Sequence, residues 1–476
     1  MSELPKGWVS TRLDEIVIKK KGKKPKQQRD TIVEGFVPYL DIFAIEKGVA
    51  RQYAEISSSR LTDENDIYVV WDGARSGWIG KGQVGAIGST IMALTPKEVD
   101  TDYLRFFLTS QFDTINSNTR GTGIPHVDPE LFWNLDVPLA PLPEQHRIVA
   151  KLEQLLARVD ACRAQIDKVP TILKRFRQSV LVAACSGRLT EDWREEVGEK
   201  EDASELLLKV SKLWFSNDAL SGRELKVINE FVNNYPLNID SYIEKELPMS
   251  WLCCNIGHIG IVSNGSTPSR KDLTYWGGSI PWVSSGEVRN NEITNTREQI
   301  TEIGYQKTSV HILPKGTVLL AMIGEGKTRG QTAILKIDAT INQNIAAIIP
   351  QFDIINSEYL WYWFQHRYEL NREEGNGSGP QALNCQRVRE LQVNLPPIEE
   401  QQEIVRRVTT LFAFSDQVEA RYKQAKTHVD RLTQSILAKA FRGELVPQDP
   451  NDEPAKVLLG RIKAEKKVVT VGKKRK

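Results

Sequence analysis

The 476-residue sequence lacks several features that would place it quickly in a functional class. It has no run of about 18 apolar residues, so no membrane span is expected. Its start, MSELPKGWVS, lacks the apolar core of a signal peptide. The five cysteines form no CxxC pair, and the six histidines show no zinc-ligand spacing. We therefore expect a cytoplasmic chain without a membrane partner, a disulfide framework or a metal, in which the adjacent Cys253 and Cys254 are buried apolar residues.

Motifs of common catalytic sites are also missing or incomplete. The segment from Val318 to Leu335, VLLAMIGEGKTRGQTAIL, resembles a phosphate-binding loop, but that loop needs a helix after it. Here β-branched and apolar residues follow, which predicts a second strand. The NLPPI stretch at Asn394 to Ile398 has a Leu between its Asn and its prolines, so it cannot hold a flipped adenine as a contiguous Asn-Pro-Pro turn does. We predict a non-catalytic chain that binds no cofactor itself.

The sequence has little net charge, but its basic residues are unevenly distributed. The formal charge is only +2, yet the stretch from Ile18 to Asp30, IKKKGKKPKQQRD, holds seven Lys or Arg residues against one Asp. The tail VGKKRK is basic again. A single charge run is often only a solvated loop. Two such runs on a near-neutral chain favour a polyanionic partner such as DNA.

An internal repeat determines the predicted architecture. PEQHRIV from Pro143 matches EEQQEIV from Glu399 at an offset of 256 residues, and Gln178-Ser179 matches Gln434-Ser435 at the same offset. Near the start of each half, LPKGW from Leu4 matches LPMSW from Leu247 at an offset of 243. The repeat predicts a mixed domain (1–143), a central helical region (144–210), a connector (211–246), a second mixed domain (247–398), a C-terminal helical region (399–446) and a basic tail (447–476).

Each helical region carries apolar residues at alternating steps of four and three. This spacing is a heptad seam, which predicts two long helices packed on each other; separate packing of each helix on its own domain is the alternative. Pro170 must kink or interrupt the first helix, whereas its counterpart Lys426 need not. The predicted packing residues are Ile148, Leu152, Leu155, Val159, Ile166, Phe176, Ile404, Val408, Leu411, Val418, Tyr422, Leu432 and Ile436.

The mixed domains have the pattern of α+β domains. DIYVVW, TVLLAMI, NIAAIIP and LDVPLAP are short apolar runs bounded by Gly, Asn, Asp or Pro, which predicts strands. TDYLRFFLTSQF and SEYLWYWFQHRYEL instead repeat at helical spacing.

The loops between these elements are rich in side chains that read DNA. Arg and Lys suit guanine edges, Asn and Gln suit adenine edges, and Ser and Thr suit bases or phosphates. The predicted DNA-binding residues are Lys23, Lys24, Trp71, Arg75, Ser76, Lys81, Arg120, Thr122, Ser266, Thr267, Ser269, Arg270, Lys271, Ser284, Ser285, Glu287, Arg289, Lys327, Thr328, Arg329, Gln331, Asn342, Asn344, Asn376 and Ser378.

Together these stretches resemble the specificity subunit of type I restriction-modification enzymes. The resemblance covers essentially the whole chain. It rests on Pro143-Glu144-Gln145, on LKRFRQSVLVAACSGRLTEDW from Leu173 and on RLTQSILAKAFRGEL from Arg431. In addition, NGSTPSRKDLTYWGGSIPWVSSGEV is similar to the opening of a target recognition domain. The first domain departs from that pattern, because KKKGKKPKQQRD lacks the small hydroxyl residues.

The resemblance implies two pseudo-symmetric target recognition domains separated by an antiparallel coiled coil of two long helices. It implies binding to an asymmetric bipartite site in double-stranded DNA. It also implies two methyltransferase subunits and two restriction and translocation subunits as partners, which use S-adenosylmethionine, ATP and magnesium. Two other classes stay open: a scaffold that joins two copies of another protein, and an enzyme that turns over alone.

Overall fold

A computed structural model describes residues 4–121, 123–198, 203–213, 222–236, 247–324, 327–351, 353–373 and 383–473. The chain divides into two compact units. The first unit consists of Met1–Lys168 with Tyr422–Lys476, and the second of Val169–Arg421. Each unit therefore combines a strand-rich domain with helical segments. In the first unit, some of these helical segments come from the distant C-terminal part of the sequence.

The described strands of the first unit form three sheets. A four-stranded sheet has the order β2 (Val17–Lys21), β10 (Ile91–Pro96), β7 (Ile67–Val70) and β8 (Ile79–Lys81). A five-stranded sheet has the order β3 (Gln28–Arg29), β5 (Tyr53–Glu55), β4 (Phe36–Leu40), β9 (Gly85–Ile87) and β6 (Leu61–Thr62). The third pairs β1 (Val9–Arg12) with β11 (Asp136–Leu139). The helix α3 (Thr101–Ser110) packs its buried Tyr103, Leu104 and Phe107 into the core.

The second unit repeats this plan. The pair β12 (Leu252–Asn255) and β21 (Gln392–Leu395) corresponds to β1 and β11. The order β13 (Gly260–Asn264), β20 (Ile345–Pro350), β17 (Val318–Ala321), β18 (Thr332–Leu335) corresponds to β2, β10, β7, β8, with β15 (Asn291–Ile293) added. The third sheet has β16 (Glu298–Ile300), β14 (Trp276–Val283) and β19 (Thr340–Ile341). The parallel pair β14 and β19 matches the parallel pair β4 and β9. The mixed helix and strand composition and the twofold repeat are confirmed.

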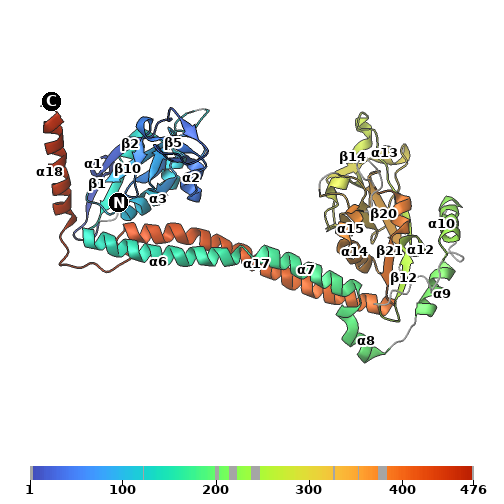
Figure 1. The fold of residues 1–476 in the computed structure, drawn as a ribbon. Helices are drawn as coiled ribbons and strands as arrows, with labels where there is room; N and C mark the ends of the chain where they lie inside the picture. The colour runs from blue at the N-terminus through green and yellow to red at the C-terminus, as the bar shows by residue number, and fades with distance from the viewer. Residues whose placement is uncertain are drawn as a thin grey trace. The chain divides into compact units, whose positions relative to one another are not determined.

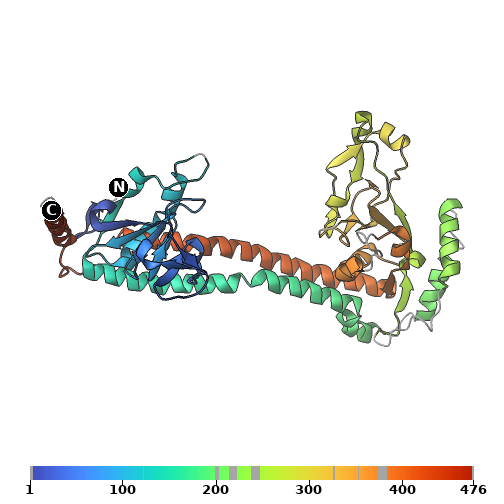
Figure 2. The same cartoon turned by 45° about the horizontal axis from the view of Figure 1, so that its top comes forward.

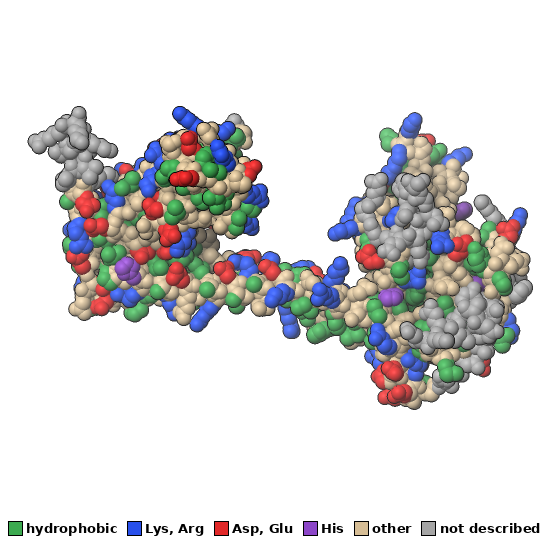
Figure 3. Space-filling view, in the orientation of Figure 1, with side chains coloured by type: hydrophobic (Ala, Val, Ile, Leu, Met, Phe, Trp, Pro, Cys, Tyr) green, Lys and Arg blue, Asp and Glu red, His purple; other side chains and the backbone are tan. Residues whose placement is uncertain are grey.

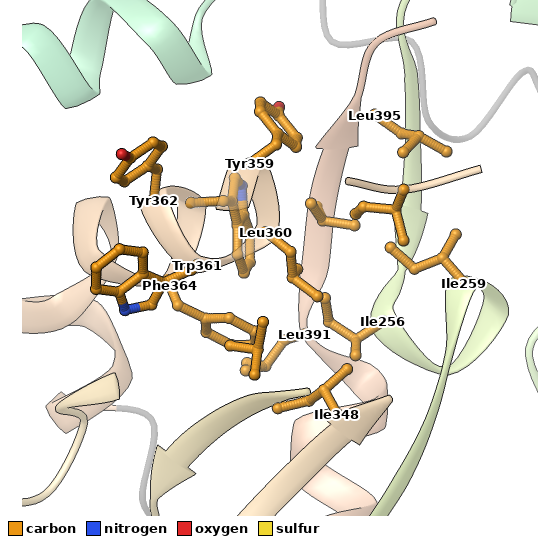
Figure 4. Close-up of a cluster of buried hydrophobic side chains, with 14 of the residues drawn as sticks. Ile256, Ile259, Ile348, Tyr359, Leu360, Trp361, Tyr362, Phe364, Leu391 and Leu395 are labelled. Atoms are coloured by element: carbon orange, nitrogen blue, oxygen red, sulfur yellow. The ribbon is translucent and has the colours of Figure 1, made fainter. Parts of the chain in front are cut away.

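The core of the second unit forms where α14 (Ser357–His366) meets the strands. Its side chains at Tyr359, Leu360 and Phe364 are fully buried. Figure 4 shows them gathered with Ile348 of β20 and with Leu391, which precedes β21. The apolar runs that predicted strands and these helices thus lie where the sequence pattern placed them.

Two narrower predictions concern single segments. Cys253 and Cys254 are buried on β12, as predicted, and burial raises the pKa of the Cys254 thiol. The segment that resembles a phosphate-binding loop runs from β17 into β18, so a strand follows it rather than a helix. Among the described residues, no helix is long and apolar enough to cross a membrane.

The heptad-patterned parts of the helical regions form α6 (Leu142–Ile166), α7 (Val169–Cys185) and α17 (Ile398–Phe441). The break between α6 and α7 precedes Pro170, whereas α17 continues without interruption through Lys426. Both outcomes were predicted, because proline lacks the amide that the helix interior requires. The α17 helix contributes its first part to the second unit and its last part to the first.

Ion pairs join α17 to its neighbours within each unit. In the first unit, Asp167 pairs with Lys426 at 2.7 Å and Arg163 pairs with Asp430 at 3.4 Å. The residue with the lower number near α6, Arg163, pairs with the residue that has the higher number on α17. The two helices therefore run antiparallel. In the second unit, Arg177 of α7 contacts Asp416 at 2.6 Å. In both views, α6 lies alongside the last part of α17 (Figures 1 and 2).

Most predicted packing residues are shielded from solvent. Ile148, Leu152, Val159, Ile404 and Val408 are buried. Leu155, Ile166, Phe176, Leu411, Val418, Tyr422 and Ile436 are partly buried. The prediction for Leu432 is wrong, because its side chain is 45% exposed. A straight helix drifts against a strict heptad repeat by about 20° per heptad. Accordingly, Leu437 is buried near this position instead.

The two motifs that recur in each half meet in space. In the first unit, Trp8 Nε1 donates to Glu144 Oε2 at 3.0 Å, and in the second Trp251 Nε1 donates to Glu400 Oε2 at 2.8 Å. The next residue ties the start of each long helix to the preceding chain: Gln145 Nε2 donates to Ala140 O and Gln401 Nε2 to Pro396 O, both at 2.8 Å. The repeated tryptophan and Glu-Gln motifs therefore fix each helix to its mixed domain.

Further helices are α8 (Glu191–Val197) and α9 (Ala203–Leu213), which begin within the predicted central region, α10 (Gly222–Asn234) in the predicted connector and α18 (Ala455–Lys473) in the predicted tail. In the predicted connector, Ile228 and Phe231 of α10 are buried, and Phe231 packs on His258. In the predicted tail, Leu458 and Ile462 of α18 are buried in the core of the first unit. The described helices α10 and α18 therefore each pack against a unit.

Candidate nucleic-acid interface

Both units build the same loop after corresponding strands, β2 in the first unit and β13 in the second. In the first unit, Lys23 N donates to Ile87 O at 3.3 Å; in the second, Ser266 N donates to Ile341 O at 3.1 Å. The glycine before each loop lies against backbone. A Cβ atom on Gly22 would sit 2.0 Å from Gly88 O, and one on Gly265 would sit 1.8 Å from Ile341 O. Only glycine allows this close approach.

The side chains on these two loops differ in charge. The first loop carries Lys23, Lys24 and Lys26, which are exposed and form no ion pair among the residues that the structure describes. The second loop carries Ser266, Thr267 and Ser269 at the corresponding positions. Thr267 Oγ1 donates to Gln343 Oε1 at 2.5 Å, which joins the second loop to the segment after β19. One backbone shape thus presents ammonium groups in one unit and hydroxyls in the other.

The other predicted cations of the first unit have acidic partners. Arg75 pairs with Glu46, and Lys81 pairs with Asp102 at 3.4 Å. Arg120 contacts Asp128 at 2.8 Å and Glu130 at 3.3 Å. All three basic side chains are more than half exposed, so solvent weakens these pairs. Thr122 lies outside the described residues.

Trp71 and Ser76 were predicted to contact DNA, but both side chains are buried. Trp71 stacks on Trp133 with ring centroids 5.6 Å apart. Ser76 Oγ donates to Gly73 O at 2.6 Å and to Pro125 O at 2.9 Å. These contacts join the β7–β8 loop to the loop that contains Arg120. The polar composition of the loop suggested exposure, whereas tertiary packing turns these two side chains inward.

In the second unit, two indole groups hold the loop between Gly265 and Asp272. Trp282 Nε1 donates to Ser266 O at 3.1 Å, and Trp276 Nε1 donates to Ser269 O at 3.2 Å. The two rings meet edge to face with centroids 5.0 Å apart. Lys271 is exposed and has no ion pair among the described residues.

Arg270 lies over the same ring system. Its guanidinium carbon is 3.8 Å from the centroid of Trp276. Its two terminal nitrogens donate to the two carboxylate oxygens of Glu298, with the Nη2 to Oε2 distance 2.9 Å. These hydrogen bonds raise the pKa of Arg270 and lower the pKa of Glu298.

The segment after β14 is organised by Glu287. Its Oε2 accepts from Ser284 N at 2.9 Å and from Ser284 Oγ at 2.8 Å, and its Oε1 accepts from Arg297 N at 2.9 Å. Both carboxylate oxygens are therefore engaged within the protein. Ser285 is partly exposed and Arg289 is exposed, and Arg289 Nε donates to Gly286 O at 2.7 Å.

The remaining predicted residues of the second unit lie on two adjoining loops. Asn342 is buried, and its Oδ1 accepts from Asn344 N at 3.1 Å, so its predicted contact with DNA is contradicted by its position. Asn344 O accepts from Met322 N at 3.0 Å, which joins this turn to the β17–β18 loop. On that loop Lys327 is exposed, whereas Thr328, Arg329 and Gln331 are partly exposed. Asn376 and Ser378 lie outside the described residues.

The structure therefore gathers the predicted residues of the second unit around the ends of β14 and β19. Figure 3 shows Lys and Arg side chains over β14 and α13 (Glu302–Gln306) in this unit, and over β5 in the first. Sequence reasoning did not select Trp276, Trp282, Glu298 or Lys26. The tryptophans follow the loop closely and were detectable as neighbours. Glu298 was not, because only strand pairing of β14 with β16 brings it to Arg270.

Comparison with known proteins gives concordant matches. The family model of the type I restriction modification DNA specificity domain matches residues 5–170 and 248–427. The specificity subunit of the type I restriction enzyme EcoBI from Escherichia coli is 28% identical over 477 residues, covering 96% of this chain and 92% of that protein. The StySPI specificity subunit from Salmonella potsdam is 26% identical over 505 residues, covering 99% and 98%.

Two solved structures share the fold. A chain from a structure on complex assembly and conformational transition of the type I R-M system has a TM-score of 0.62 and 20% identity, covering 93% of this chain and 100% of that chain. The HsdS subunit from Thermoanaerobacter tengcongensis has a TM-score of 0.54 and 18% identity, covering 93% and 98%.

Proposed function

The chain belongs to the type I restriction-modification DNA specificity family, and from this premise we propose that it reads an asymmetric bipartite DNA site. Each mixed domain, 1–143 and 247–398, is the target recognition domain for one half-site. The observation that carries the proposal is the twice-built loop, in which one backbone geometry displays different side chains in the two units. Two similar readers with different contact chemistry fit two different half-sites.

The proposed contacts are the predicted residues whose side chains reach the surface, except Arg270, whose two terminal nitrogens are held by Glu298. In the first unit these are led by Lys23 and Lys24, and in the second by Ser269, Lys271, Arg289 and Lys327, all of which are exposed. Phosphate contacts orient a protein on the duplex, and contacts to base edges supply the sequence preference. The buried Trp71, Ser76 and Asn342 support these loops instead of meeting DNA.

The spacer between the half-sites is the proposed task of the helices. We take α6 and α7 with α17 as an antiparallel coiled coil, supported by the shielded apolar seam and by the ion pairs from Asp167 to Lys426 and from Arg177 to Asp416. The 44 residues of α17 make a helix roughly 66 Å long. Dimeric DNA-binding proteins place half-sites about 34–36 Å apart or at multiples of that distance. The length of the helices would therefore set the length of the spacer.

The chemistry of the complex belongs to partners in this proposal. The chain is the non-catalytic subunit, and its helical regions dock two methyltransferase subunits, with two restriction and translocation subunits completing the enzyme. Those subunits use S-adenosylmethionine, ATP and magnesium. Each half-site then contains an adenine that a methyltransferase subunit flips out of the duplex and methylates.

The test is to express the chain with its neighbouring methyltransferase subunit and to map methylated adenines across the genome by long-read sequencing. One asymmetric bipartite motif, absent when the chain is omitted, is the expected result. Methylation at the same motif without the chain would reduce it to a scaffold. So would DNA binding by the purified chain that depends on salt and ignores sequence.

A matched deletion tests the ruler. Removing one heptad from α6 and the opposite heptad from α17 shortens the helices by about 10 Å, which is about three base pairs. The methylated motif should then keep both half-sites and lose base pairs from its spacer. A spacer of unchanged length would contradict the ruler.

A further inference from the structure

Arg270 was predicted as a DNA contact, but its surroundings within the second unit suit another role. The two terminal nitrogens of its guanidinium both donate to Glu298, and one face of the group lies on Trp276. Arginine reads guanine through two parallel N–H groups aimed at O6 and N7. In Arg270 the outer edge that carries both terminal nitrogens already holds a carboxylate, and the carboxylate compensates its charge.

The contacts of Arg270 continue into the loop that precedes it. Trp276, on which Arg270 lies, donates to Ser269 O, and it also meets Trp282, which donates to Ser266 O. Fixing the Trp276 ring therefore fixes both ends of the segment from Ser266 to Ser269. Those residues carry the hydroxyls that distinguish this loop from its counterpart.

The equivalent loop of the first unit lacks this arrangement. Five residues after Gly22 stands Gln27, as Arg270 stands five residues after Gly265. A glutamine side chain carries no charge to pair with a carboxylate. Lys23, Lys24 and Lys26 attract phosphates whatever the exact loop shape, whereas hydroxyls at 266, 267 and 269 must be placed accurately to discriminate bases.

We propose that Arg270, held by Glu298 and Trp276, is a positioning residue that sets sequence discrimination at the half-site of the second unit without contacting DNA. The proposal rests on the proposed function. Within that function, the loop from Ser266 to Ser269 discriminates between base pairs, and Arg270 holds that loop in position.

The experiment uses the full chain in complex with its methyltransferase subunit and four variants: R270Q, R270K, E298Q and the exchange R270E with E298R. The probes are duplexes that carry the methylated motif or single base-pair changes in either half-site. Affinity is measured at several salt concentrations, and thermal melting checks that each variant is folded. Discrimination at the half-site of the first unit is the internal control.

A positioning role predicts that R270Q and E298Q lower discrimination at the second half-site by a similar factor, about tenfold. Lysine keeps the charge but not the paired geometry, so R270K should fall between. The exchanged pair should recover most of the discrimination, and the salt dependence should not change.

A direct DNA contact predicts a different pattern. R270Q would then lower the slope of log affinity against log salt by about 0.9, while E298Q would free the arginine and strengthen binding. That result, or unchanged discrimination in both R270Q and E298Q, overturns the inference. If the wild-type complex recognises no bipartite motif at all, the proposed function fails instead, and the two failures are distinguishable.

Discussion

The two units contain the same buried tryptophan and glutamate pair, yet they satisfy it differently. In the second unit, Glu400 Oε2 accepts from Trp251, while Oε1 accepts from Thr190 Oγ1 at 2.7 Å and pairs with Arg194. In the first unit, Glu144 Oε2 accepts from Trp8, but Oε1 is buried without a hydrogen-bond partner among the described residues.

The difference shows that a repeated motif need not have the same hydrogen-bond and ion-pair partners in both copies. Burial raises the pKa of Glu144, whereas Glu400 has an arginine within reach. The nearest cation on the helix that carries Glu144 is Arg147, whose Nη2 is 2.7 Å from Asp452 Oδ2. One copy therefore holds a buried ion pair, and the other holds a carboxyl group that burial drives toward its neutral form.

The largest expected effect is a difference in stability between variants of the two glutamates. Glu400→Gln removes the counter-charge of Arg194, whose side chain is only 17% exposed. A buried charge left without its partner costs about 3–5 kcal/mol. The matched change Glu144→Gln removes no ion pair and should stay within about 1 kcal/mol of wild type at pH 7. Amide hydrogen exchange in β12 and in β1 reports each unit separately. Equal losses in both units would show that the two pairs are equivalent.

The salt dependence of DNA affinity should differ between alanine variants of the two loops. Changing Lys23, Lys24 and Lys26 to alanine removes three exposed cations, so the slope of log affinity against log salt should fall by about 2.7. Alanine at Ser266, Thr267 and Ser269 should leave the slope unchanged and weaken discrimination at one half-site. The measurement is a binding titration at several salt concentrations. An equal slope change for both triple variants would show that charge is not divided between the loops.

The smallest expected effect is a pH dependence confined to the first unit. The folded first unit binds the Glu144 proton more tightly than the unfolded chain, because the folded pKa is raised. This contribution to stability is fully present below the unfolded pKa, about 4.3, and is lost as pH rises through the folded value. Wild type should therefore gain stability over Glu144→Gln as pH falls from 7 toward about 4.5. Denaturation at a series of pH values measures it, and parallel curves would contradict the raised pKa.

Much of the fold was predictable because local patterns and the repeat agree. The apolar runs gave β7, β11, β17 and β20, the helical spacing gave α3 and α14, and Pro170 marked the break between α6 and α7. These features depend on residues close together in the chain. The candidate interface was less predictable, since loop polarity located the loops but did not separate the exposed Lys24 from the buried Ser76.

By itself, the sequence determined that the chain is built twice, which segments are strands and helices, and where proline interrupts the first long helix. Only the tertiary structure decided which side chains face inward and which charges are paired. Glu298 reaches Arg270 through strand pairing, and Arg194 reaches Glu400 across 206 positions of sequence. Leu432 leaves the seam because the α-helical period differs from a strict heptad. These ion-pair partners and buried faces depend on which residues come close together in the folded chain. The spacing of residues in the sequence does not encode those contacts.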